Sequence, residues 1–264
     1  MKINEIKCKT ALSNSRLPGL DYSLNPYRGC QHNCCYCYVP NILRIDRSQW
    51  GSFVDVKKNI PVVLSNELRK KKPGVVGIST VTDPYQPVEK KYDLTRYCLE
   101  QILIHDLPVH IQTKSDLVLK DTDLISKFSD VEVMFSIATL NDYERKILEP
   151  YSSSIQNRLK AMRKLSDNGI KTTVFFGPIY PTVKKEDLPI IIDKFIENGA
   201  EEIMVDKFNL KPGIRENTIH NIKRNPILLD TFMKNIDNSN YFENIRDKLM
   251  ESGKNKNIRI IDAF

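Results

Sequence analysis

The sequence predicts an α/β fold with a parallel β-sheet, and three observations support this prediction. Short, continuous apolar runs alternate with helical segments of about 10 to 15 residues, which is the pattern of βαβ units. The chain has 264 residues, 41% of them hydrophobic and 28% charged, and a single α/β barrel takes about 250 residues. Polar residues and prolines follow the apolar runs, as expected for loops that line a site above a packed core.

Six strands are expected, each from a short and mainly apolar run. They lie at about Tyr22–Tyr27, Val75–Ser79, Val109–Thr113, Val131–Ser136, Lys171–Phe176 and Glu202–Val205. Helices are expected at about Val39–Arg47, Leu64–Lys71, Leu94–His105, Asp121–Phe128, Ser154–Asn168 and Lys185–Asn198. Turn signals end two of these helices: Pro73 and Gly74 follow one, and Gly169 follows another.

The two ends of the chain differ in composition from the middle. Residues 1–20 are polar and expected to be irregular, whereas residues 21–208 hold the alternating strands and helices. Residues 209–264 are interrupted by Asn, Lys and Pro residues and are expected to form a helical extension packed on the sheet domain. Its helices are predicted at about Pro226–Ile236 and Tyr241–Glu251.

Charge and composition indicate which partners and which cellular compartment to expect. The net charge is +7 and the sequence pI is about 9.0, a mild basic excess that fits a nucleic-acid substrate and equally fits general solubility. No apolar run approaches the roughly 20 residues of a membrane span, so no membrane partner is expected. The first residues lack the apolar core of a signal peptide, and clustered free thiols indicate the reducing cytoplasm.

Four of the six cysteines lie within eight consecutive positions, between Asn25 and Tyr38. Cys30, Cys34 and Cys37 have the spacing C-x3-C-x2-C, and Cys35 lies between the last two. Three soft thiolates on one short loop select a soft metal or an iron–sulfur cluster. A cluster normally takes four thiolates, so a set of three leaves one iron free for another ligand.

A structural zinc site is the alternative interpretation of this loop. Zinc would need a fourth ligand, for which His32 or Cys35 is available. Adjacent Cys34 and Cys35 are poorly placed to bind one ion together, and no second Cys/His pair follows at zinc-finger spacing. A disulfide is excluded for these neighbours by geometry.

The run from Asn25 to Tyr38, with its C-x3-C-x2-C spacing and an aromatic residue before the last cysteine, resembles the cluster loop of radical S-adenosylmethionine (SAM) enzymes. The longer sequence Asn-Pro-Tyr-Arg-Gly-Cys resembles the spore photoproduct lyase-like branch, which is related to DNA repair photolyases. This resemblance implies a partial (β/α)6 TIM-type barrel with a C-terminal helical extension. It also implies a 4Fe-4S cluster, SAM, and an external flavodoxin- or ferredoxin-like electron donor.

The resemblance assigns roles to residues at the carboxyl ends of the predicted strands, where sites of parallel α/β folds lie. Thr82 and Asp83 correspond to polar residues near the SAM amino group. Lys114 corresponds to a lysine at the SAM carboxylate, and Ser136 is placed to reach the ribose. Tyr36 corresponds to an aromatic residue beside adenine.

Tyr38 matches one of two tyrosines near the radical path of the lyase, and it is the candidate catalytic residue. Thr80 marks a departure, because the lyase has a hydrogen-donating cysteine at this position and a threonine O–H bond is too strong to replace it. Simpler roles stay open: Lys114 as a solvated lysine, Ser136 as a turn residue and Tyr38 as packing. Glu149 and Arg158 are expected to form a structural ion pair.

Three functional hypotheses follow. The first is radical chemistry on a nucleic-acid base or lesion, the second is the same chemistry on a peptide or small metabolite, and the third is a non-catalytic zinc or nucleic-acid-binding module. Fold and cofactor alone do not identify the substrate.

Overall fold

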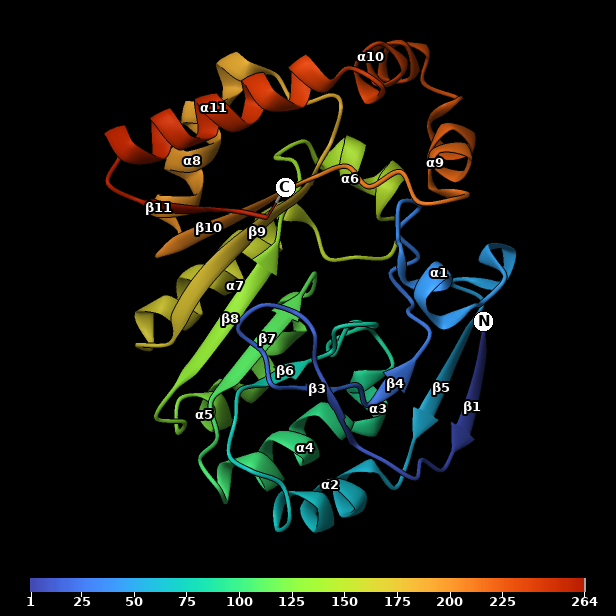
Figure 1. Ribbon diagram of the computed structural model, residues 1–264, viewed down its shortest axis with the longest axis vertical. Helices are drawn as coiled ribbons and strands as arrows, with labels where there is room; N and C mark the ends of the chain where they lie inside the picture. The colour runs from blue at the N-terminus through green and yellow to red at the C-terminus, as the bar shows by residue number, and fades with distance from the viewer. Residues whose placement is uncertain (264) are drawn as a thin grey trace.

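The computed structural model describes residues 1–263, which form an open sheet of eight strands covered by helices (Figure 1). The strand order is β11-β10-β9-β8-β7-β6-β3-β2, and the two ends of the sheet do not pair. The six central strands are parallel and are β3 (Tyr22–Leu24), β6 (Val76–Ile78), β7 (Val109–Thr113), β8 (Val131–Ser136), β9 (Lys171–Ile179) and β10 (Glu202–Lys207). The predicted α/β partial barrel is therefore confirmed.

Six of the helices between these strands lie within a few residues of the predicted positions: α1 (Val39–Leu43), α2 (Ile60–Leu68), α4 (Leu94–Leu103), α5 (Thr122–Ile125), α7 (Ile155–Asp167) and α8 (Leu188–Glu197). Two short helices were not predicted, α3 (Glu89–Tyr92) and α6 (Asp142–Leu148). Three short 3-10 helices add η1 (Arg47–Gln49), η2 (Asp116–Asp121) and η3 (Lys185–Asp187). Helix α7 shows why its ends could be read from the sequence: Ser154 caps its first turn, and Gly169 follows it with φ 74°.

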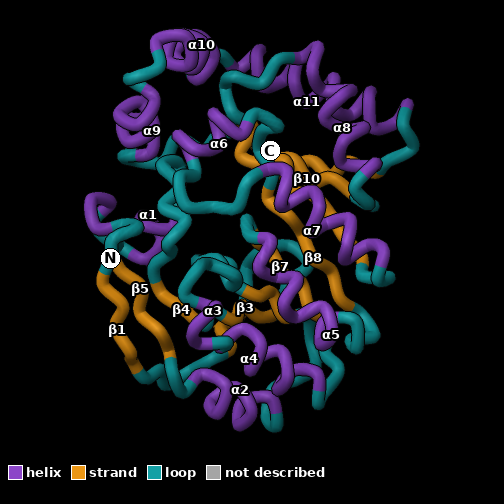
Figure 2. The backbone as a smooth tube through the Cα atoms, turned by 180° about the vertical axis from the view of Figure 1, so that it is seen from behind, coloured by secondary structure: helices purple, strands orange, loops and turns teal. Residues whose placement is uncertain are grey.

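The two faces of the sheet differ, because side chains alternate along each strand. One face carries the fully or almost fully buried Ile111, Val133, Phe135, Val174 and Ile203, over which the helices pack. Figure 2 shows α4, α5 and α7 lying across this face. The main apolar core therefore lies between sheet and helices, and the opposite, concave face is free to carry polar residues.

The N-terminal residues are not irregular, which corrects the prediction for residues 1–20. Lys2–Ile6 forms β1, which pairs in parallel with β5 (Phe53–Lys57), and β4 (Tyr27–Arg28) completes this small second sheet. Leu12–Asn14 forms β2, antiparallel to β3. Strand β1 is an edge strand with mostly exposed side chains, so it lacks the apolar pattern that reveals a buried strand. The predicted single strand Tyr22–Tyr27 is in fact two strands in two sheets.

The C-terminal residues form three helices and one further strand. Helices α9 (Ile214–Ile222), α10 (Pro226–Ile236) and α11 (Ser239–Asn255) run along one end of the molecule, drawn in orange to red in Figure 1. Strand β11 (Arg259–Asp262) then returns and pairs in parallel with β10. The extension thus lengthens the sheet itself besides packing on it. No helix within residues 1–263 is long and apolar enough to cross a membrane.

Candidate active site

The cysteine loop connects β4 to α1 and has a tightly constrained backbone. Gly29 opens the loop with φ 88°, and a Cβ atom there would lie 2.4 Å from the carbonyl oxygen of Phe53. Only glycine satisfies both the conformation and this close approach. Later in the loop Asn33 also has a positive φ, of 50°. The chain is thereby turned so that the cysteines follow in quick succession.

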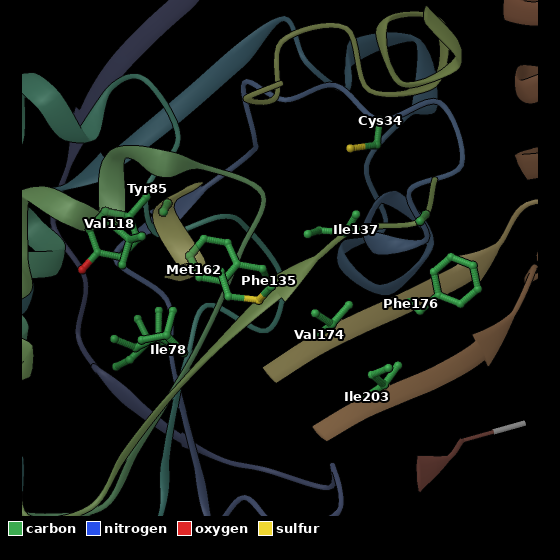
Figure 3. Packing of buried hydrophobic residues seen from close by; sticks show 14 of the residues in the cluster. Cys34, Ile78, Tyr85, Val118, Phe135, Ile137, Met162, Val174, Phe176 and Ile203 are labelled. Atoms are coloured by element: carbon green, nitrogen blue, oxygen red, sulfur yellow. The ribbon is translucent and has the colours of Figure 1, made fainter. Parts of the chain in front are cut away.

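Cys30, Cys34 and Cys37 all lie on this loop, as free thiols that are buried or half-buried. Burial raises the pKa of all three thiols, and each carries an electrostatic interaction with at least one of the others. Cys30 and Cys34 are each 8% exposed. Figure 3 shows Cys34 on its loop near Ile137, at one end of the buried apolar cluster. Three shielded thiols that repel one another as thiolates are a donor set that a cationic iron–sulfur cluster would satisfy.

The two residues that could complete a zinc site are engaged elsewhere. The Nδ1 atom of His32 lies 3.1 Å from the carbonyl oxygen of Tyr151, and Nε2 lies 3.2 Å from a carboxylate oxygen of Asp83. The thiol of Cys35 donates a hydrogen bond to Thr218 in α9, at 3.8 Å. These contacts leave Cys30, Cys34 and Cys37 as the predicted donor set of the loop. Within residues 1–263, no three His, Cys, Asp or Glu side chains are arranged around a single ion.

Gln86 lies in the loop after β6, is fully buried, and fixes the cysteine loop through hydrogen bonds. Its amide nitrogen donates to the Thr82 hydroxyl at 2.9 Å, and its amide oxygen accepts the backbone N–H of Gln31 at 2.9 Å. The Thr82 hydroxyl in turn donates to the carbonyl of Gly29 at 2.6 Å. Thr82, a predicted SAM-binding residue, thus has its hydroxyl engaged in fixing the start of the cysteine loop.

Asp83 is the second predicted SAM-binding residue in this loop, and it is 6% exposed. Its carboxylate accepts hydrogen bonds from the Thr113 hydroxyl and from the backbone N–H of Lys114, both at 2.8 Å. Burial by itself would raise the pKa of Asp83, but the adjacent His32 and these donors hold it at about 2. Asp83 is a fixed anion that ties the ends of β6 and β7 to the cysteine loop.

Lys114 follows β7 and brings the positive charge of the site. Its side chain lies among the charges of Cys34, Glu149 and Asp83. Burial alone would lower the pKa of the ammonium group, but Cys34 and Glu149 raise it above its usual value. Among residues 1–263 no carboxylate lies within salt-bridge distance of its Nζ atom. A half-buried cation without a direct counter-ion is suited to an anionic group of a ligand.

A buried ion pair supports the cysteine loop from the opposite side. Arg158 on α7 is fully buried and binds the carboxylate of Glu149 at 2.5 Å. Glu149 also accepts hydrogen bonds from the hydroxyls of Tyr36 and Tyr180, the latter at 3.2 Å. The expected Glu149–Arg158 pair is confirmed, and its tie to Tyr36 extends it into the loop.

Tyr36 is held by this network on one side and by aromatic rings on the other. Its ring meets Tyr180 edge-on at a centroid distance of 5.4 Å and Phe208 at 6.1 Å. Burial, followed by the charge of Glu149, raises the pKa of its hydroxyl. The ring is 7% exposed, so Tyr36 is a packed anchor for the segment between Cys34 and Cys37.

The concave face of the sheet carries a row of polar and apolar groups at its carboxyl end. Register places Gln112 opposite Met134, Ser136 opposite Phe175, and Phe175 opposite Met204, so all five share this face. Ser136 accepts a hydrogen bond from Gln112 at 3.2 Å through its hydroxyl. Its carbonyl accepts one from Arg158 at 2.7 Å. Ser136 is therefore joined to the ion pair that anchors Tyr36.

Tyr38 lies at the rim of this face and is 39% exposed. Its hydroxyl donates to the carbonyl of Thr80 at 3.4 Å, and the ammonium group of Lys211 lies 5.3 Å from its ring centroid. Burial raises its pKa, as do the charges of Cys37 and Asp206. Tyr38 thus bridges the ends of β6 and β10, which are separated by three strands in the sheet.

The sequence interpretation missed the hydrogen bonds that α9 and the residues just before it make with the cysteine loop and α1. Asn217 donates to the carbonyl of Cys35 at 2.5 Å, Thr218 meets the Cys35 thiol, and Pro212 accepts a hydrogen bond from Asn41 at 3.0 Å. These partners are more than 170 positions apart in the chain. No local signal could have identified them, and Gln86 was missed for the same reason.

Comparison with known proteins identifies the family. The radical SAM superfamily matches residues 24–195, which include the cysteine loop and four of the six central parallel strands in full. The chain belongs to the radical SAM superfamily. Members of this superfamily use a 4Fe-4S cluster and SAM, so both predicted cofactors are confirmed at the level of the family. They also require an external reductant.

Relatives of known sequence come from archaea, viruses and bacteria. An uncharacterized protein of Methanocaldococcus jannaschii is 40% identical over 182 residues, covering 69% of either chain. One of Acidianus two-tailed virus is 33% identical over 198 residues, covering 69% of this chain and 65% of the relative. A radical SAM Nα-GlyT isomerase of Pseudomonas phage M6 is 26% identical, covering 68% of this chain and 38% of the isomerase. The chain spans about two thirds of the length of the first two relatives.

Solved structures support the fold at low sequence identity. Spore photoproduct lyase with bound AdoMet and dinucleoside spore photoproduct is similar with a TM-score of 0.73 and 14% identity, covering 98% of this chain and 80% of the lyase. SuiB of Streptococcus suis, bound to the precursor peptide SuiA, has a TM-score of 0.60 and 14% identity, covering 100% of this chain and 48% of SuiB. The family match and these similarities confirm the predicted assignment to a radical SAM protein of spore photoproduct lyase-like fold.

Proposed function

We propose that this radical SAM protein binds its cluster through Cys30, Cys34 and Cys37 and modifies a nucleic-acid base or lesion. The observation that carries the first part is the isolated set of three thiols on one loop, with His32 and Cys35 engaged by other partners. Held by these three cysteines, a 4Fe-4S cluster would supply the electron for reductive cleavage of SAM, and the resulting 5′-deoxyadenosyl radical would abstract hydrogen from the substrate. The residues of the chain supply binding, orientation and shielding.

The residues around the loop divide these tasks. Lys114 binds the SAM carboxylate, because its Nζ has no direct counter-ion while its charge is stabilised by surrounding anions. Ser136 reaches the ribose from the end of β8. Thr82 and Asp83 shape the loop that receives the amino group, since their side chains already fix the start of the cysteine loop and the end of β7. Tyr36 fixes the last cysteine beside the adenine site.

The substrate lies over the concave face, next to the carboxyl ends of β9 and β10. Phe175 and Met204 offer half-buried apolar surface to a planar ring. Asp206 lies two residues after Met204, where the register between β9 and β10 is irregular, and its side chain is half-buried. A carboxylate here accepts hydrogen bonds from the N–H groups of a base.

Three further features support a nucleic-acid substrate. The net charge is +7, and Lys211 stands at the rim beside Tyr38. The spore photoproduct lyase of similar fold binds a dinucleoside photoproduct. A target base has to be flipped out of a duplex to reach an enclosed site, which favours damaged or single-stranded substrates.

Tyr38 takes part near the radical path, and Thr80 in place of a cysteine indicates a final step different from that of the lyase.

The test uses anaerobically reconstituted protein with SAM, dithionite and oligonucleotides. A uniformly deuterated oligonucleotide that is a substrate should transfer deuterium to 5′-deoxyadenosine. Binding should weaken steeply with salt, because released counterions drive association. Lys211→Met should reduce the salt slope by about one counterion, whereas Lys248→Met, which removes a half-exposed lysine of α11 paired with Glu251, should not.

Absence of oligonucleotide binding at low ionic strength would rule out the nucleic-acid part of the proposal. Deuterium transfer from a labelled peptide or small metabolite would assign the substrate to that second class. Either result would leave the proposed cluster ligands intact, since they are tested by iron content.

A further inference from the structure

Trp50 is the only tryptophan of the chain, and it packs against the outer side of the cysteine loop. Its side chain is 6% exposed and forms a small apolar cluster with Cys30 and Val39, separate from the main core. Cys37 packs against the same cluster. The indole ring therefore shares one apolar cluster with two of the three proposed cluster ligands.

The indole N–H of Trp50 lies buried and without a proper acceptor. Its Nε1 atom makes no hydrogen bond of normal geometry to any group in residues 1–263. Cys37 packs against the same apolar cluster as the indole ring. The buried N–H therefore lies in a cluster lined by cysteine sulfurs and has no hydrogen-bond acceptor there.

An indole N–H without an acceptor is suited to a neighbouring sulfur that becomes negatively charged. A neutral thiol is a weak acceptor, whereas a thiolate accepts strongly, and metal binding requires the thiolate. A buried N–H without an acceptor is costly in a protein interior. Formation of a metal–thiolate bond at Cys37 would therefore satisfy the one polar group of Trp50.

The segment that carries Trp50 is itself fixed against the loop. The Nη1 atom of Arg47 donates a hydrogen bond to the carbonyl oxygen of Cys37 at 2.8 Å. Gly51 has φ 82°, and a Cβ atom there would lie 2.3 Å from the side chain of Asn33. Contacts on both sides of Trp50 thus set the position of its ring independently of the indole N–H.

We propose that Trp50 is a positioning residue for the cluster, whose indole N–H donates a hydrogen bond to the Cys37 thiolate. Donors to cluster sulfurs stabilise the reduced state, which carries more negative charge. Trp50 therefore raises the reduction potential of the cluster and eases its reduction by the external donor. This inference rests on the ligand set proposed above and adds a residue outside the cysteine motif.

The test uses the cluster-loaded full chain and exploits the single tryptophan. Growth on 15N-indole-labelled tryptophan labels position 50 alone, and pulsed electron paramagnetic resonance of the reduced cluster reports coupling to this nitrogen. Trp50→Phe keeps an aromatic ring but removes the N–H, so the midpoint potential should become more negative. Val39→Ala removes packing from the same apolar cluster and leaves the N–H in place.

The proposal predicts a 15N coupling and a loss of one exchangeable proton coupling in Trp50→Phe. It also predicts a larger fall in potential for Trp50→Phe than for Val39→Ala. An absent 15N coupling, or equal shifts in the two variants, would overturn it while iron content still supports the three cysteines. If Trp50→Phe fails to load iron, replacement of Trp50 by its benzothienyl isostere, which has sulfur in place of N–H, provides the same comparison.

Discussion

Replacing Glu149 by Gln should destabilise the fold and release the anchor of the cysteine loop. The Glu149 carboxylate is 1% exposed and lies 2.5 Å from the fully buried guanidinium of Arg158. Gln keeps the size of the side chain but leaves that guanidinium without its counter-charge. Removal of one partner from a buried ion pair costs about 3–5 kcal/mol. The same substitution weakens the acceptor of the Tyr36 hydroxyl.

The pKa of Glu149 gives an independent magnitude. Burial favours its neutral form, but Arg158, Lys114 and Tyr36 lower the pKa from 4.5 to about 2. A carboxyl with a lower pKa in the folded state stabilises the fold above its unfolded pKa and loses this effect as pH falls toward the folded one. The difference corresponds to about 3 kcal/mol, lost between about pH 4.5 and pH 2. Glu149→Gln should lack this part of the acid sensitivity.

Urea unfolding of the apoprotein, followed by circular dichroism from pH 7 downward, measures both effects. Asp167→Asn is a matched control, because Arg163 and Asp167 form an exposed ion pair at 2.8 Å and such a pair contributes about 0–1 kcal/mol. The reasoning is refuted if the free energy of unfolding falls no more in Glu149→Gln than in Asp167→Asn at pH 7. An unchanged acid profile in Glu149→Gln would likewise contradict the assigned pKa.

Three further substitutions separate the roles around the site. Lys114→Ala should keep its iron and bind SAM about 10- to 100-fold more weakly by isothermal titration, because it loses a charge-assisted contact; unchanged affinity would exclude the contact. Cys35→Ala should keep the cluster spectrum and lose about 1 kcal/mol of stability, because its thiol donates a hydrogen bond to Thr218. Loss of iron in this variant would make Cys35 a ligand. Asp206→Asn should lower substrate turnover about 10- to 100-fold without reducing SAM cleavage in the absence of substrate, and equal loss of both would contradict its role.

The central sheet could be predicted because its strands carry mainly apolar residues on the face that they bury. Val109–Thr113 and Val131–Ser136 were delimited from sequence with the bounds that the structure gives. Strand β1 escaped notice because an edge strand with exposed side chains needs no apolar pattern. Helix α9 was likewise missed, since it packs through only Ile214, Thr218 and Ile222.

The cysteine spacing identified the proposed ligands, because that chemistry is written in consecutive residues. The supports of the loop are a different matter. Gln86, Glu149 and Asn217 reach it from three other parts of the chain. Each contact exists only after the strands have paired, so spacing along the sequence carries no trace of it. Trp50 lies near the motif in sequence, yet its N–H is informative only because it is buried without an acceptor.

The most direct test of this account is the product of SAM cleavage by anaerobically reconstituted protein. With dithionite as reductant, the wild-type chain should hold about four iron atoms and form 5′-deoxyadenosine. Cys30→Ala, Cys34→Ala and Cys37→Ala should each lose this product, whereas Cys35→Ala should retain it. A colourless protein that carries zinc, or a Cys35→Ala variant that loses its iron while Cys34→Ala keeps it, would contradict the proposed centre.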